Sequence, residues 1–226
     1  MNKKNETLTD LAYTEIRELI LTGQLKPQEL ITENSLQQRL NLGRTPIREA
    51  ILRLANKKLI IIHPRKGIEV APITVKMIHD IFQVRLMFEP NALKYSAPNL
   101  SKEWLREMLD RFYEYQSRNI LTDSKIVLEY VKLDDYFHRS LIAPLNNDYV
   151  TSLVDSYSDH FLFIRSSIVP VYYANDKTGH KEIIEALIND DIETACKTLE
   201  AHINYSYTEM IDYYVKKDLL QVSPKF

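Results

Sequence analysis

The chain has 226 residues, of which 45% are hydrophobic and 27% are charged, as is usual for a globular protein. No apolar run approaches the roughly 20 residues of a membrane-spanning helix, and residues 1–6 lack the apolar core of a signal peptide, which predicts a cytoplasmic protein with no membrane partner. The single cysteine, Cys196, excludes a disulfide framework, and the four glycines cannot form a nucleotide-binding G-x-G-x-x-G motif or a P-loop.

Charge is distributed unevenly along the chain. Residues 1–75 carry 12 Lys and Arg against 8 Asp and Glu, whereas residues 76–226 carry 17 against 23. A basic first part and an acidic second part predict two domains with different partners. The segment Ala71-Pro72-Ile73 interrupts the pattern like a short linker, so we expect the domains to span residues 1–72 and 73–226.

Three short helices are predicted in the first domain. Apolar residues recur at helical spacing over residues 8–22 and again over residues 32–40. The third helix, over residues 44–54, has one apolar stripe, and Pro46 lies in its first turn, where the missing N–H costs nothing. The second and third helices are separated by a turn of three residues, 41–43, which is helix-turn-helix spacing.

The third helix presents basic side chains beside its apolar stripe. Arg44 and Arg48 are four residues apart and therefore lie together, with Thr45 further round the helix. Guanidinium groups at the N-terminal end of a helix suit a DNA major groove, where they can bond guanine edges and reach phosphates. On these residues alone, a surface helix with solvated arginines is an equally good interpretation.

A two-stranded hairpin is predicted after the third helix. Residues 59–62 are apolar and mostly β-branched, residues 63–67 form a turn, and residues 68–70 alternate in polarity. The tip of this wing carries Arg65 and Lys66, which can reach a minor groove or backbone phosphates. Three helices and a basic wing make a winged helix, and together they indicate DNA binding.

Residues 30–70, centred on Arg44-Thr45-Pro46-Ile47-Arg48-Glu49-Ala50, resemble the winged-helix domain of GntR-type bacterial transcription regulators. The resemblance implies that the two arginines contact operator bases and that the wing glycine, Gly67, lets the tip approach DNA. Gly43 stands where the family usually has serine, so a helix cap is lost, and Lys58 stands where it usually has glycine. The candidate DNA-binding residues are Arg44, Thr45, Arg48, Arg65, Lys66 and Gly67.

The second domain shows helical periodicity and almost no strand signal. Candidate helices lie near residues 74–96, 101–118, 123–143, 148–168, 179–189 and 191–216. They predict an all-α antiparallel bundle of six to seven helices, long enough to bury its own core. The chain as a whole is therefore expected to be mostly α, with an N-terminal winged helix-turn-helix domain.

Polar residues interrupt the apolar stripes of three of these helices. Asp134 and His138 share a stripe with Val131 and Leu141, and His180 and His202 occupy equivalent places on two later helices. A carboxylate is rarely buried unless it is paired or metal-bound. One Asp and three His can form a cage for Zn²⁺, Ni²⁺, Mn²⁺ or Fe²⁺, but hydrogen-bonded core histidines and a simple Asp–His salt bridge fit the spacing equally well.

The sequence Asp134-x-x-Phe137-His138, followed by His180 and His202, resembles the FCD-type effector domain of the GntR branch named for a fatty-acid regulator. The resemblance implies that these four residues bind a divalent metal and that a carboxylate effector completes its shell. Arg85-Leu86-Met87-Phe88-Glu89 resembles the R-x-x-x-E motif of the first helix of that domain. A cation such as Arg85 near the metal would help to hold an anionic effector.

These features predict a homodimeric regulator, and more specifically a repressor, in which two winged helices bind a pseudo-palindromic operator. A small organic acid, bound with the metal, would act through unequal affinity for the DNA-competent and DNA-incompetent states. The main alternative is a metal-dependent hydrolase or lyase with an appended DNA-binding domain. We do not expect an enzyme, because Glu182 and Glu185 should face away from the His180 stripe, which leaves no identifiable general base. A further alternative is a DNA-binding protein whose histidines are structural.

Overall fold

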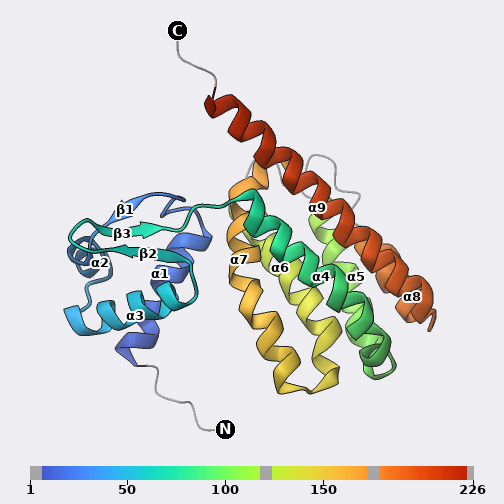
Figure 1. The fold of residues 1–226 in the computed structure, drawn as a ribbon. Coiled ribbons are helices and arrows are strands. Elements are labelled where there is room, and N and C mark those ends of the chain that lie inside the picture. Colours follow the sequence, from blue (N-terminus) through green and yellow to red (C-terminus); the bar gives the residue numbers. More distant parts are fainter. Residues whose placement is uncertain (1–6, 118–123, 173–178, 223–226) are drawn as a thin grey trace. The chain divides into compact units, whose positions relative to one another are not determined.

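A computed structural model describes residues 7–117, 124–172 and 179–222, and the chain divides into two compact units, Met1–Ile73 and Thr74–Phe226 (Figure 1). The chain is mostly helical, as predicted. Among the described residues, no helix combines the length and the apolar character needed to cross a membrane.

The first unit is a winged helix, which confirms the predicted fold. Its elements are α1 (Leu8–Leu21), β1 (Leu30–Ile31), α2 (Glu33–Leu40), α3 (Arg44–Asn56), β2 (Ile60–His63) and β3 (Gly67–Val70). The predicted apolar stripe of α3 is buried at Ile47, Ala50, Ile51 and Leu54, and it packs against the buried face of α1. This burial turns the opposite face of α3, with its arginines, toward solvent.

The wing contains a third strand that was not predicted. The sheet is antiparallel in the order β1-β3-β2, with Leu30 opposite Glu69 and Ile31 opposite Ile68. A strand of two residues is too short to show the alternation that identifies strands in a sequence. The backbone of β1 also explains Gly67, whose φ is +114° and at which a Cβ would lie 2.8 Å from the carbonyl oxygen of Ile31.

In its described residues the second unit is a bundle of six α-helices with two short 3₁₀ turns, in agreement with the predicted all-α domain. The α-helices are α4 (Val75–Ser96), α5 (Lys102–Ser117), α6 (Ser124–Ile142), α7 (Asp148–Tyr172), α8 (His180–Ile188) and α9 (Ile192–Val222). The 3₁₀ turns are η1 (Ala97–Asn99) and η3 (Ala143–Leu145). The predicted helix ends at residues 118 and 123 lie outside the described residues, and α7 and α9 extend beyond their predicted ends.

Packing in the bundle brings residues that are far apart in sequence to one place. Helix α4 lies along α9, α5 packs against α8, and α6 packs against α7 (Figure 1). Helix α8 is tied to α5 by Lys102, whose Nζ donates to the carbonyl oxygens of Leu187 and Ile188 at 2.7 and 2.8 Å. These contacts hold the C-terminal end of α8, and thereby the whole short helix, in position.

Candidate metal centre and DNA-binding surface

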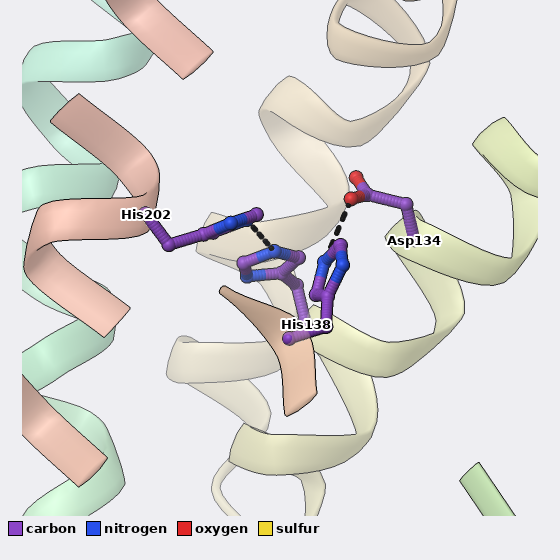
Figure 2. Close-up of side chains that lie close together, drawn as sticks. Asp134, His138 and His202 are labelled. Carbon is purple, nitrogen blue, oxygen red and sulfur yellow. Dashed lines mark hydrogen bonds and ion pairs between the residues drawn. The ribbon is translucent and has the colours of Figure 1, made fainter. Parts of the chain in front are cut away.

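The four predicted metal ligands lie together in the interior of the bundle. Asp134 and His138 lie on α6, His180 is the first residue of α8, and His202 lies on α9. Each contributes one ligand atom to a group in which all the atoms lie within 4.8 Å of one another, and no member is more than 5% exposed. Figure 2 shows the side chains of Asp134, His138 and His202 turned toward one another.

Potential ligand atoms lie at short distance from one another inside this cluster. Nε2 of His180 lies 3.0 Å from Oδ1 of Asp134, and Nε2 of His138 lies 3.0 Å from Nε2 of His202. When both rings are neutral, Nε2 of His138 and Nε2 of His202 can share only one proton between them, so at least one of the two nitrogens presents a lone pair to the other. A cation suits a place where lone pairs and a carboxylate converge.

Glu89 on α4 fixes the tautomer of His138. Its Oε2 accepts a hydrogen bond from Nδ1 of His138 at 2.8 Å. Burial raises the pKa of Glu89, but Arg85 and His138 outweigh burial and hold it at about 2, so the carboxylate can only accept. Burial and the charge of Arg85 lower the pKa of His138, which keeps the ring neutral. The lone pair of His138 is therefore on Nε2, the atom that faces the cluster.

The carboxylate of Asp134 is ionised and completely buried. Burial raises its pKa, but the Arg165 guanidinium, with Nη2 at 3.5 Å from Oδ1, together with His180 and His138 outweighs burial, and the pKa lies well below its ordinary value. Within the described part of the chain, neither oxygen accepts a hydrogen bond of good geometry. A cation bound by this cluster would give a buried carboxylate oxygen of Asp134 a partner. One carboxylate and three imidazoles fit Zn²⁺, Ni²⁺, Mn²⁺ or Fe²⁺.

Arg85, the predicted effector-binding residue, is buried beside this cluster and pairs with Glu89. Its Nε donates to Oε1 at 2.6 Å and its Nη2 to Oε2 at 3.3 Å. Tyr157 donates to the same Oε1 at 3.0 Å. The charge of Arg85 is therefore already matched, and an effector carboxylate that reached it would compete with Glu89.

The predicted DNA-binding side chains lie at the surface of the first unit. Arg44, Thr45 and Arg48 are exposed on the first turns of α3, and Arg65 and Lys66 are exposed between β2 and β3, next to Gly67. Gly43 is the N-cap residue of α3, and no side-chain hydrogen bond caps the helix there. This agrees with the predicted loss of the serine cap. None of these side chains is packed into the core.

Two charged residues beside the candidate sites were not predicted from the sequence. Glu33, the first residue of α2, pairs with both Arg44 and Arg48, and Arg165 of α7 contacts Asp134. For Arg165 a signal was present, since a charge directly after Phe161-Leu162-Phe163-Ile164 interrupts a buried apolar run. Glu182 and Glu185 are exposed, as predicted, so neither can serve as a base at the cluster.

Each of the two units matches a known protein family. Residues 8–70 match the family of bacterial regulatory proteins named gntR, and residues 80–205 match the FCD domain. The chain is 23% identical over 205 residues to the HTH-type transcriptional repressor GlaR of Escherichia coli K12, which covers 87% of this chain and 93% of that protein. It is 24% identical over 219 residues to the gluconate operon transcriptional repressor of Bacillus licheniformis, with 91% and 86% covered.

A solved structure has the same fold. The crystal structure of a GntR transcriptional regulator from Rhodococcus sp. RHA1 superimposes with a TM-score of 0.76 at 20% identity, and the match covers 90% of this chain and 97% of that chain. The architecture of a winged helix followed by a helical domain is therefore shared with that protein.

Proposed function

The chain belongs to the GntR family of bacterial regulatory proteins and carries an FCD domain, and we propose that it is a homodimeric repressor controlled by a divalent metal ion and a small carboxylate effector. That it is a DNA-binding transcriptional regulator and not an enzyme follows from its relatives, which are regulators and in several cases repressors. The metal, the effector, the dimer and the residues that serve them make up the proposal. A regulator that binds operator DNA in bacteria works in the cytoplasm.

The surface of the first unit supports binding to operator DNA through α3 and the wing. Arg44 and Arg48 can bond guanine edges in the major groove, with Thr45 beside them. Arg65 and Lys66 at the wing tip can reach the minor groove or phosphates, and Gly67 permits the tight turn behind them. Two such units in a twofold dimer would match the two halves of a pseudo-palindromic operator.

The buried cluster supports metal binding, and it is the observation that carries the proposal. A buried set of one Asp and three His is typical of the metal site in FCD domains, and here the four ligand atoms lie within 4.8 Å of one another. Asp134, His138, His180 and His202 would hold the ion. When bound, a divalent ion supplies a Lewis acid that attracts the oxygens of an organic acid. Glu89 orients His138 for this task.

Arg85 and Arg165 support a negatively charged effector. Both guanidinium groups are buried near Asp134, and one relative is named for the operon of gluconate, a small carboxylate. We propose a small organic acid whose carboxylate draws Arg85 away from Glu89. Glu89 lies on α4, the first helix after the boundary at Ile73, and contacts His138 of α6 and Tyr157 of α7, so a change at Glu89 would alter the packing of the helix that follows the DNA-binding unit.

Native mass spectrometry of protein purified without chelators tests the proposal in one measurement. We expect a dimer that carries one divalent metal ion for each chain, and a small acid in part of the population. A metal-free monomer that still releases no acid on denaturation would overturn the proposed control by metal and effector, although not the family or its DNA-binding role.

A further inference from the structure

Glu33 lies between Arg44 and Arg48, two of the three arginines of α3. Its Oε2 is 3.6 Å from Nε of Arg44, and its Oε1 is 3.5 Å from Nε of Arg48. One carboxylate thus faces two guanidinium groups, one with each oxygen. The side chain of Glu33 is 33% exposed, whereas those of Arg44 and Arg48 are 72% and 60% exposed, so the carboxylate lies deeper than the groups that it pairs.

We propose that Glu33 is a positioning residue that sets the sequence specificity of DNA recognition, an inference that rests on the proposed role of Arg44 and Arg48. Both ion pairs use the Nε side of the guanidinium. The two terminal Nη groups of an arginine can supply both hydrogen bonds of a bidentate contact with guanine. A carboxylate behind the two arginines therefore orients them without blocking the end that reads a base.

Charge explains why this arrangement favours base reading over general DNA binding. Two arginines at i and i+4 repel each other, and without a shared anion they would separate and find phosphates in many orientations. The carboxylate of Glu33 reduces the net positive charge at this end of α3 and is itself repelled by phosphates. It therefore weakens binding to any DNA and, by fixing the two guanidinium groups, preserves the contacts that only the correct sequence offers.

The pairs are not explained by stability alone. Exposed ion pairs contribute little to folding, and Glu33 already stands in the first turn of α2, where any acidic side chain suits the helix dipole. Loss of the charge should consequently leave the fold intact and change DNA recognition. This separates a positioning role from a structural one.

The test compares Glu33→Gln with wild type and with Glu15→Gln, which removes the same charge from the exposed face of α1. Wild-type protein first selects a duplex from a random-sequence library. Affinities for the selected duplex and for a shuffled duplex of the same composition are then measured over a range of salt concentrations. For Glu33→Gln we expect tighter binding to the shuffled duplex, a salt dependence steeper by about one phosphate contact, and a specificity ratio lowered by about tenfold.

Each other outcome has a definite meaning. An unchanged ratio in Glu33→Gln, or an equal change in Glu15→Gln, would overturn the role of Glu33. A parallel loss of both affinities together with a lowered melting temperature would also overturn it, since that result indicates a structural role. Failure of the wild-type protein to enrich any duplex would instead overturn the proposed DNA-binding function.

Discussion

Glu89 accepts a hydrogen bond from Nδ1 of His138 at 2.8 Å, and this contact leaves the Nε2 lone pair of the histidine facing Asp134, His180 and His202. The pair joins α4 to α6. Glu89, which is not a proposed metal ligand, therefore governs the orientation of His138, which is one. Carboxylates that hold a metal-binding histidine in this way tune affinity in many metalloproteins.

Replacing Glu89 by Gln should weaken metal binding by roughly 10- to 100-fold, because the amide carries no charge and does not fix the Nδ1 proton of His138 as firmly. Competition with a metal-sensitive fluorescent chelator would measure the change. Glu182→Gln, on the exposed face of α8, is the matched control and should bind metal like wild type. Equal affinities in wild type and Glu89→Gln would refute the orienting role, provided that circular dichroism shows both proteins folded.

Replacing Arg48 by Ala should cost about 1–3 kcal/mol of operator affinity, since a base-reading arginine contributes about that much discrimination. The loss should be greater for the selected duplex than for a shuffled one. Arg39→Ala removes the same charge from exposed α2 and serves as the control. Equal losses in both variants would mean that Arg48 contributes only general charge.

Replacing Lys58 by Gly should stabilise the first unit. Lys58 has a φ of +58°, in the left-handed region, which costs a residue with a Cβ about 1–2 kcal/mol, and glycine avoids this cost at the expense of a more flexible unfolded chain. We expect a net gain of about 0.5–1 kcal/mol in chemical denaturation. Lys57→Gly, at a φ of −79°, should instead destabilise. A loss of stability in both variants would contradict the account.

The first unit should lose stability as the pH falls through the range between the unfolded and folded pKa values of Asp10. Hydrogen bonds from Arg53 and Thr7 lower its pKa from 3.8 to about 2. The folded chain therefore keeps this carboxylate ionised at a pH where the unfolded chain protonates it, so its contribution is present above pH 3.8 and is lost as the pH falls toward 2. Asp10→Asn should show a shallower loss of stability in this window than wild type. An identical pH dependence in both proteins would exclude the contribution.

Periodicity made most of the fold predictable and placed the four residues of the buried cluster on inward-facing stripes, whereas their role as metal ligands was predicted from the family resemblance. Asp134 and His138 stand at positions where a 3.6-residue repeat demands apolar side chains, and this violation is visible without coordinates. Helix α3 was predictable in the same way, because Ile47 and Leu54 mark its buried face and leave Arg44 and Arg48 outside.

The remaining features depend on which elements approach one another. Strand β1 is two residues long and is recognisable only through its pairing with β3. Glu33 is an ordinary first-turn acid in sequence, and only the packing of α2 against α3 brings it between two arginines. Arg165 meets Asp134 across two helices, a contact that no local pattern encodes.

Metal content is the most direct test of the buried cluster. Wild-type protein, reconstituted with Zn²⁺, Ni²⁺, Mn²⁺ or Fe²⁺ and desalted, should retain close to one ion per chain by elemental analysis. His202→Ala should lose it, whereas His79→Ala, which removes an exposed histidine of α4, should keep it. A wild-type protein that retains none of these ions, or a His202→Ala protein that retains as much as wild type, would contradict the account.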